Sequence, residues 1–88
     1  ADFMDSIVAE TLDLVFEEVA INDHSKYINK KLRETNFSKE LSLIVIAIRR
    51  KSGELFFHPT GESVIEVGDL LIIVGKADSV QKLVEANK

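Results

Sequence analysis

The stretch Val64–Gly75 reads Val-Ile-Glu-Val-Gly-Asp-Leu-Leu-Ile-Ile-Val-Gly and predicts a turn followed by the central strand of the fold. Leu70–Val74 is an unbroken apolar run, too short for a helix and rich in branched side chains, so we expect a strand buried on both faces. Gly68 can adopt a positive φ, and the Asp69 carboxylate can accept hydrogen bonds from turn amides, which predicts a tight turn before the strand.

Outside this stretch, the apolar periodicity predicts an α+β fold. Residues 3–14 show the three-and-four spacing of an amphipathic helix, and Ser25 can cap a short helix from Lys26 to Thr35. A last amphipathic helix follows Gly75. Further strands are predicted at 16–21, 43–48, 55–58 and 64–65, with a hairpin turn at 51–54 and a stop at Pro59. We expect a small, mostly antiparallel sheet of four to five strands with two short helices packed on it, preceded by the N-terminal helix.

Length and composition indicate one soluble domain. A chain of 88 residues buries only about 60 to 65% of its unfolded surface, which favours an additional partner surface. The longest apolar run, 43–48, is far shorter than the roughly 20 residues of a membrane span. The sequence contains no cysteine and no visible signal peptide, which favours a cytoplasmic setting. Because it begins Ala-Asp-Phe and its only methionine is Met4, we interpret it as a piece of a longer protein.

Charge is distributed unevenly along the chain. Residues 1–25 carry seven carboxylates and no lysine or arginine, whereas residues 26–51 carry eight basic side chains and two glutamates. This split can orient two halves of a fold, or two copies of it. Alternatively, the charges are solvated faces of unrelated elements. We expect no nucleic-acid partner, because the net charge is −4 and the basic segment lacks interleaved exposed aromatic residues.

No catalytic constellation stands out in the sequence. Gly75-Lys76 follows a strand, but a phosphate-binding loop would need glycine at Leu70 and serine or threonine at Ala77. Neither histidine has a partner at zinc-like spacing. We therefore expect no enzyme activity, although His58, before Pro59 at a strand end, is a candidate pocket residue.

The densest group of carboxylates lies near the first predicted helix-to-strand junction. Glu17 and Glu18 are adjacent, and Glu10 and Asp13 precede them by one to two helical turns. Carboxylate oxygens are the ligands that calcium prefers, so this group is a candidate metal site. The alternative is that these side chains face water.

Three segments together resemble the C-terminal subdomain of regulators of potassium conductance, the RCK-C or TrkA-C family. They are Leu43–Arg50, the hairpin that ends at Pro59, and Val67–Gly75 with its Gly-Asp turn. The resemblance covers residues 16–88. It implies that residues 1–15 are a crossover or linker helix from a preceding nucleotide-binding subdomain that is absent here.

The resemblance implies regulation rather than catalysis. Members of this family dimerise, and a ligand changes the spacing of units attached to a potassium channel or transporter. A ligand that prefers one arrangement shifts the population of gate states by its differential affinity. We therefore expect a cytoplasmic, ligand-sensing, homodimeric regulatory domain associated with a membrane transport protein. The alternative is a purely structural oligomerisation module that has no ligand of its own.

The resemblance also suggests two regulatory ligands. Some members bind cyclic di-AMP in a cleft between two C-terminal subdomains, and the resemblance implies that here Phe37 or His58 would pack on the adenines and Asn36 would form hydrogen bonds. The corresponding residues here are Leu32, Thr35, Asn36, Phe37, Leu43, Ile44, His58 and Pro59. Channel-type relatives instead use calcium at acidic positions, which favours Glu10, Glu17 and Glu18.

Overall fold

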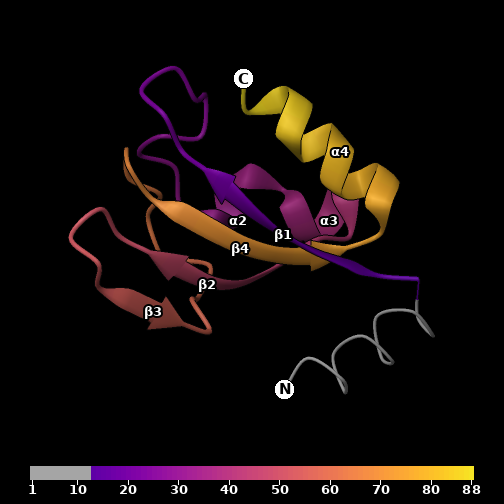
Figure 1. Cartoon of the computed structure of the whole chain (residues 1–88), viewed down its shortest axis with the longest axis horizontal. Coiled ribbons are helices and arrows are strands. Elements are labelled where there is room, and N and C mark those ends of the chain that lie inside the picture. The colour runs from indigo at the N-terminus through magenta and orange to yellow at the C-terminus, as the bar shows by residue number, and fades with distance from the viewer. Residues whose placement is uncertain (1–12) are drawn as a thin grey trace.

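The fold is seen in a computed structural model, which describes residues 13–88. The helix expected over 3–14, and with it most of the linker segment 1–15, lies outside the described residues. The predicted α+β class is confirmed, because a four-stranded antiparallel sheet carries short helices on one side (Figure 1). Within residues 13–88, no helix has the length and apolarity needed to cross a bilayer.

The sheet places the Leu70–Gly75 strand in its interior, as the sequence predicts. The strands are β1 (Val15–Ala20), β2 (Ile44–Arg49), β3 (Leu55–Phe57) and β4 (Leu70–Gly75). Their spatial order is β1-β4-β2-β3, and every neighbouring pair is antiparallel. β2 and β3 form the expected hairpin, whose turn uses Gly53 at a φ of 98°.

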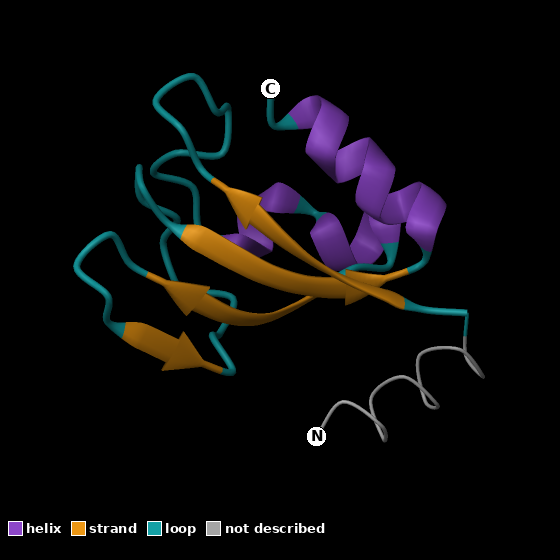
Figure 2. Ribbon diagram, in the orientation of Figure 1, coloured by secondary structure: helices purple, strands orange, loops and turns teal. Residues whose placement is uncertain are grey.

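Within residues 13–88, helices cover only one face of the sheet, and the expectation that the central strand is buried on both faces is wrong. Leu71 and Ile73 are fully buried, whereas the alternate residues Ile72 and Val74 stay partly exposed. The reason is that all three described helices lie on the same side of the sheet (Figure 2). The longest of them, α4 (Ala77–Ala86), inserts Val80 and Leu83 into the core.

The helix expected over Lys26–Thr35 is also wrong for most of its length. Residues 26–29 form turns, and the helical part consists of two short pieces, α2 (Leu32–Thr35) and α3 (Phe37–Leu41). Asn29 has a φ of 67°, which interrupts any helix there. Its backbone N–H donates to the Ile65 carbonyl at 2.7 Å instead of to a helical partner. Long-range pairing therefore overrides the local apolar spacing.

The same pairing explains why residues 64–65, predicted as an edge strand, do not join the sheet. That segment forms a single antiparallel bridge, Lys31 with Val64, rather than a strand of the sheet. The Ile65 N–H donates to the Lys30 carbonyl at 2.9 Å, and the Ile65 side chain is fully buried in the core. Segment 63–65 thus anchors the beginning of α2.

The predicted Gly-Asp turn is present and holds a buried ion pair. Gly68 has a φ of 87°, and its N–H donates to the Ile21 carbonyl at 2.7 Å. The Asp69 side chain is 1% exposed, and its Oδ2 accepts from Arg50 Nη1 at 2.5 Å and from the Glu66 N–H at 2.8 Å. Arg50 Nη1 also donates to the Val64 carbonyl at 2.9 Å. One carboxylate therefore joins the end of β2, the 64–66 segment and the start of β4.

Replacing Asp69 by asparagine is expected to lower the free energy of unfolding by about 3 kcal/mol, because Arg50 would keep its charge in a largely buried place without a counter-ion. The measurement is urea unfolding followed by circular dichroism. The matched control is Asp23→Asn, which removes a largely exposed carboxylate and should change stability by less than about 0.5 kcal/mol. Equal stability of the two variants would contradict the role assigned to Asp69.

Candidate functional site

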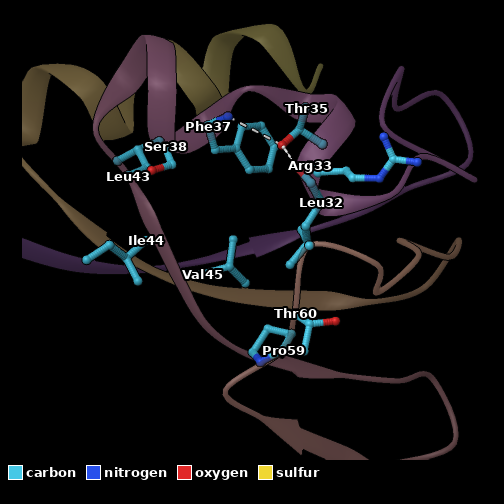
Figure 3. Close-up of a pocket in the computed structure, with 11 residues that line it drawn as sticks. Leu32, Arg33, Thr35, Phe37, Ser38, Leu43, Ile44, Val45, Pro59 and Thr60 are labelled. Atoms are coloured by element: carbon cyan, nitrogen blue, oxygen red, sulfur yellow. Dashed lines mark hydrogen bonds between the residues drawn. The ribbon is translucent and has the colours of Figure 1, made fainter.

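A hollow of about 260 Å³ lies beside the first residues of β2 (Figure 3). It exists because β3 is shorter than β2 and pairs only with Ala47–Arg49. Beyond β3, His58 donates its N–H to the Ile46 carbonyl at 2.8 Å with a φ of 60°, and Pro59 then leads the chain away from the sheet. No strand of the described residues therefore pairs with the outer edge of β2 before Ile46. α2, α3 and residues 59–61 form the other walls.

The structure brings most of the sequence-predicted ligand residues to this pocket. Six of the eight line it: Leu32, Thr35, Phe37, Leu43, Ile44 and Pro59. They come from α2, α3, the approach to β2, β2 itself and the loop after β3. Three segments separated in sequence thus converge on one concave, largely apolar surface.

The other two predicted residues, Asn36 and His58, do not line the pocket. Asn36 is the left-handed joint between α2 and α3, with a φ of 61°, and its side chain is exposed. The His58 side chain is also exposed, and its ring centroid lies 6.4 Å from that of Phe57. Both residues shape the backbone around the pocket.

Phe37 forms part of the pocket wall but is not a free stacking platform. Its side chain is 4% exposed, and its ring packs edge-to-face on Tyr27 with centroids 5.0 Å apart. Burial, followed by the nearby Glu40 charge, raises the pKa of the Tyr27 hydroxyl above its ordinary value. Tyr27, which does not line this pocket, therefore holds the Phe37 ring in its place in the wall.

Sequence reasoning missed five residues of the lining: Arg33, Ser38, Val45, Thr60 and Gly61. Gly61 reaches the site because its carbonyl accepts from the Arg33 N–H at 3.0 Å, which docks the loop on α2. No local pattern reveals this contact. Val45 and Ser38 could have been found as chain neighbours of predicted residues.

Leu43 occupies its place in the wall because residue 75 has no side chain. A Cβ on Gly75 would collide with Leu43 Cδ2. The two residues lie 32 positions apart, at the end of β4 and before the start of β2. The pocket wall and the end of the central strand are therefore fitted to each other.

Charge at the pocket rim is concentrated in one cluster. Glu62 Oε2 accepts from Arg33 Nε at 2.8 Å, and Glu62 Oε1 lies 3.0 Å from Lys31 Nζ. These hydrogen bonds, first that of Lys31 and then that of Arg33, hold the pKa of the Glu62 carboxyl below its ordinary value. Arg33 is the only charged residue that lines the pocket in the described part of the chain.

The described residues give no support to the calcium site. Glu17 and Glu18 are consecutive on β1, so their side chains point to opposite faces of the sheet. Glu10 lies outside the described residues. From Asp13 onward, no group of three or more acidic, histidine or cysteine side chains is placed to hold a metal ion.

The face of the sheet that no described helix covers, called the open face below, is strongly apolar. Cross-strand pairing puts Phe16, Val74 and Ile44 side by side on it, and likewise Ile72, Ala47 and Phe57. The exposed fractions are 51% for Phe16, 62% for Ile44 and 74% for Phe57. Ile44 also lines the pocket, so the open face and the pocket are contiguous.

Comparison with known proteins places these features in context. The family model described as the TrkA-C domain matches residues 16–87. The chain is 31% identical over 84 residues to the ammonium/H⁺ antiporter subunit AmhM of Alkalihalophilus pseudofirmus, covering 96% of this chain and 50% of that protein. It is 28% identical over 81 residues to the K⁺/H⁺ antiporter subunit KhtT of Bacillus subtilis, covering 92% and 49%. The chain thus spans about half the length of the curated relatives it matches.

Solved structures with this fold include complexes with a cyclic dinucleotide. The RCK_C domain dimer of S. agalactiae BusR with c-di-AMP superposes with a TM-score of 0.73 and 25% identity, covering 81% of this chain and 92% of that one. The KtrA RCK C domain with c-di-AMP gives a TM-score of 0.78 over 96% and 94%, and at 19% identity it supports the fold alone.

One structural neighbour leaves the predicted absence of a nucleic-acid partner open. S. agalactiae BusR in complex with its busA-promotor DNA has a TM-score of 0.70 at 23% identity. The match covers 93% of this chain but only 46% of that one. At this identity the likeness shows the fold and carries no function to this chain.

Titration of Glu62 should reveal the rim cluster. Carbon-13 NMR of its carboxyl is expected to give a pKa below that of an ordinary glutamate, and Lys31→Gln or Arg33→Gln should raise it. Because the folded-state pKa is depressed, the stability that this cluster adds is present above the ordinary glutamate pKa and is lost as the pH falls through the lowered one. A midpoint that neither substitution moves would refute the cluster.

Proposed function

The chain belongs to the TrkA-C domain family, and from this membership we propose that it is a ligand-sensing regulatory domain of a cation transport system. Two of its curated relatives are subunits of an ammonium/H⁺ and a K⁺/H⁺ antiporter, so an antiporter is a better-supported partner than a channel. We propose that the domain acts on the cytoplasmic side of the membrane and works by binding rather than by catalysis.

Cyclic di-AMP is the regulatory ligand that we assign to the pocket. The observation that carries this proposal is the convergence of Leu32, Ile44 and Pro59 on one apolar hollow beside the first residues of β2. Apolar walls suit the faces of adenine bases, and the Thr60 hydroxyl, which accepts from the Glu62 N–H, can donate its proton to their edges. The BusR domain that was solved with c-di-AMP has the same fold.

A second copy of the chain is the occupant that we assign to the open face. The face is apolar at its centre, and it also carries Glu18 and Arg49, two opposite charges that can pair across a two-fold axis. The likeness to an RCK_C domain dimer supports this choice. Because Ile44 belongs to both surfaces, a copy on the open face would border the pocket, and ligand binding would change how the two copies sit.

Calorimetry with cyclic di-AMP tests the ligand. Wild type should bind, and Ile44→Asp should weaken binding at least tenfold, because it replaces an apolar contact of about 1.5 to 3 kcal/mol with a like charge near the phosphates. Val67→Asp is the matched control, since Val67 is an exposed apolar residue in the turn before β4, whereas Ile44 pairs with Val74 near the other end of that strand. If both variants bind as wild type does, the ligand does not use this pocket.

Sedimentation tests the dimer separately. Phe57 lies on the open face but does not line the pocket, so Phe57→Asp should weaken self-association more than tenfold by burying an unpaired charge. Its circular dichroism spectrum should stay unchanged, because Phe57 is largely exposed. A chain that is monomeric at high micromolar concentration, with or without ligand, would contradict the proposal. A dimer indifferent to every nucleotide would favour the alternative of a structural module.

A further inference from the structure

The side chain of Arg33 lies at the pocket in two parts with different surroundings. Its stem contributes to the lining, whereas its guanidinium group is directed away from the other lining residues (Figure 3). Glu62 holds it there through the 2.8 Å bond from Arg33 Nε. Among the described residues that line the pocket, Arg33 is the only cation, and Glu62 holds its guanidinium group outside the pocket.

We propose that Glu62 is a built-in competitor for Arg33, and that a phosphate of the bound nucleotide draws the guanidinium from Glu62 into the pocket. The inference rests on the proposed function, since it assumes an anionic ligand in this hollow. Guanidinium binds phosphate through paired hydrogen bonds, which a single bond from Nε to a carboxylate does not use fully. Glu62 thereby sets the affinity of the site.

The surroundings of Glu62 allow this exchange without disturbing the loop. The backbone bonds from Leu32 N to the Ser63 carbonyl and from Arg33 N to the Gly61 carbonyl, at 2.9 and 3.0 Å, do not involve either side chain's charge. Lys31 stays on the other oxygen of Glu62, so the carboxylate keeps a counter-ion when Arg33 leaves. The bond to be broken joins two exposed groups, and such pairs change an equilibrium by up to about fivefold.

The test is calorimetry with cyclic di-AMP on four proteins: wild type, Glu62→Gln, Arg33→Gln and the double variant. Glu62→Gln should bind about two- to fivefold more tightly, because Arg33 is released. Arg33→Gln should bind about tenfold or more weakly and lose part of its salt dependence. In the Arg33→Gln background, Glu62→Gln should not change the affinity further, because the gain in affinity requires the Arg33 guanidinium group.

The matched control is Glu85→Gln, which removes an exposed, lysine-paired carboxylate on α4 outside the pocket lining. It should leave the affinity unchanged. A gain for Glu85→Gln equal to that for Glu62→Gln, or a gain for Glu62→Gln that persists without Arg33, would overturn the competitor role, because either result would reflect net charge alone. Unchanged affinity in Glu62→Gln would overturn it as well.

A failure of the proposed function would be recognised separately. If wild type takes up no cyclic di-AMP, the ligand assignment falls, and the competitor is judged with pyrophosphate by following the Arg33 Nε–H resonance in nitrogen-15 NMR. A larger shift in Glu62→Gln than in wild type supports the competitor, and equal shifts overturn it. The two proposals are thus decided by different observations.

Discussion

The ion pair between Asp69 and Arg50 is the constraint on which the rest of the structure depends. It lies where the end of β2 runs beside the start of β4. The Asp69 carboxylate also accepts a hydrogen bond from the Glu66 N–H. A buried ion pair adds little net stability compared with apolar packing, but it penalises every arrangement that leaves one charge unpaired. Its main effect here is to specify which segments meet. The 64–66 segment is held beside Arg50, and through the Lys31 bridge it fixes where α2 begins.

The sheet could be predicted from the sequence because its signals are local. The apolar run of β4, the hairpin around Gly53 and the Gly68-Asp69 turn each depend on a few neighbouring residues, and all three are present. The helix expected from Lys26 onward failed for the opposite reason. Its apolar residues have helical spacing, but the backbone groups of Asn29 and Lys30 form hydrogen bonds with Ile65, more than thirty residues away. The burial of β4 was overestimated because an apolar run does not reveal whether both of its faces are packed against other parts of the chain.

The candidate site was predictable to the extent that a family pattern marks it. That pattern pointed to residues on three segments, and six of the eight converge on the pocket. It could not show that Phe37 is tied into the core by Tyr27, or that His58 turns outward at a positive φ. It also missed Arg33 and its partner Glu62, because their contact depends on how the loop after Pro59 folds back on α2. Charge pairs of this kind have no periodicity from which they could be read.

The fit between Gly75 and Leu43 has a consequence for how this domain can diversify. Since a side chain at position 75 would occupy the space of Leu43, residue 75 can become larger only if residue 43 becomes smaller. We expect the two positions to covary among homologues, with a bulkier residue at 75 accompanied by a smaller one at 43. The shape of this pocket wall would then change by coordinated substitutions at the two positions rather than by a single substitution at position 75.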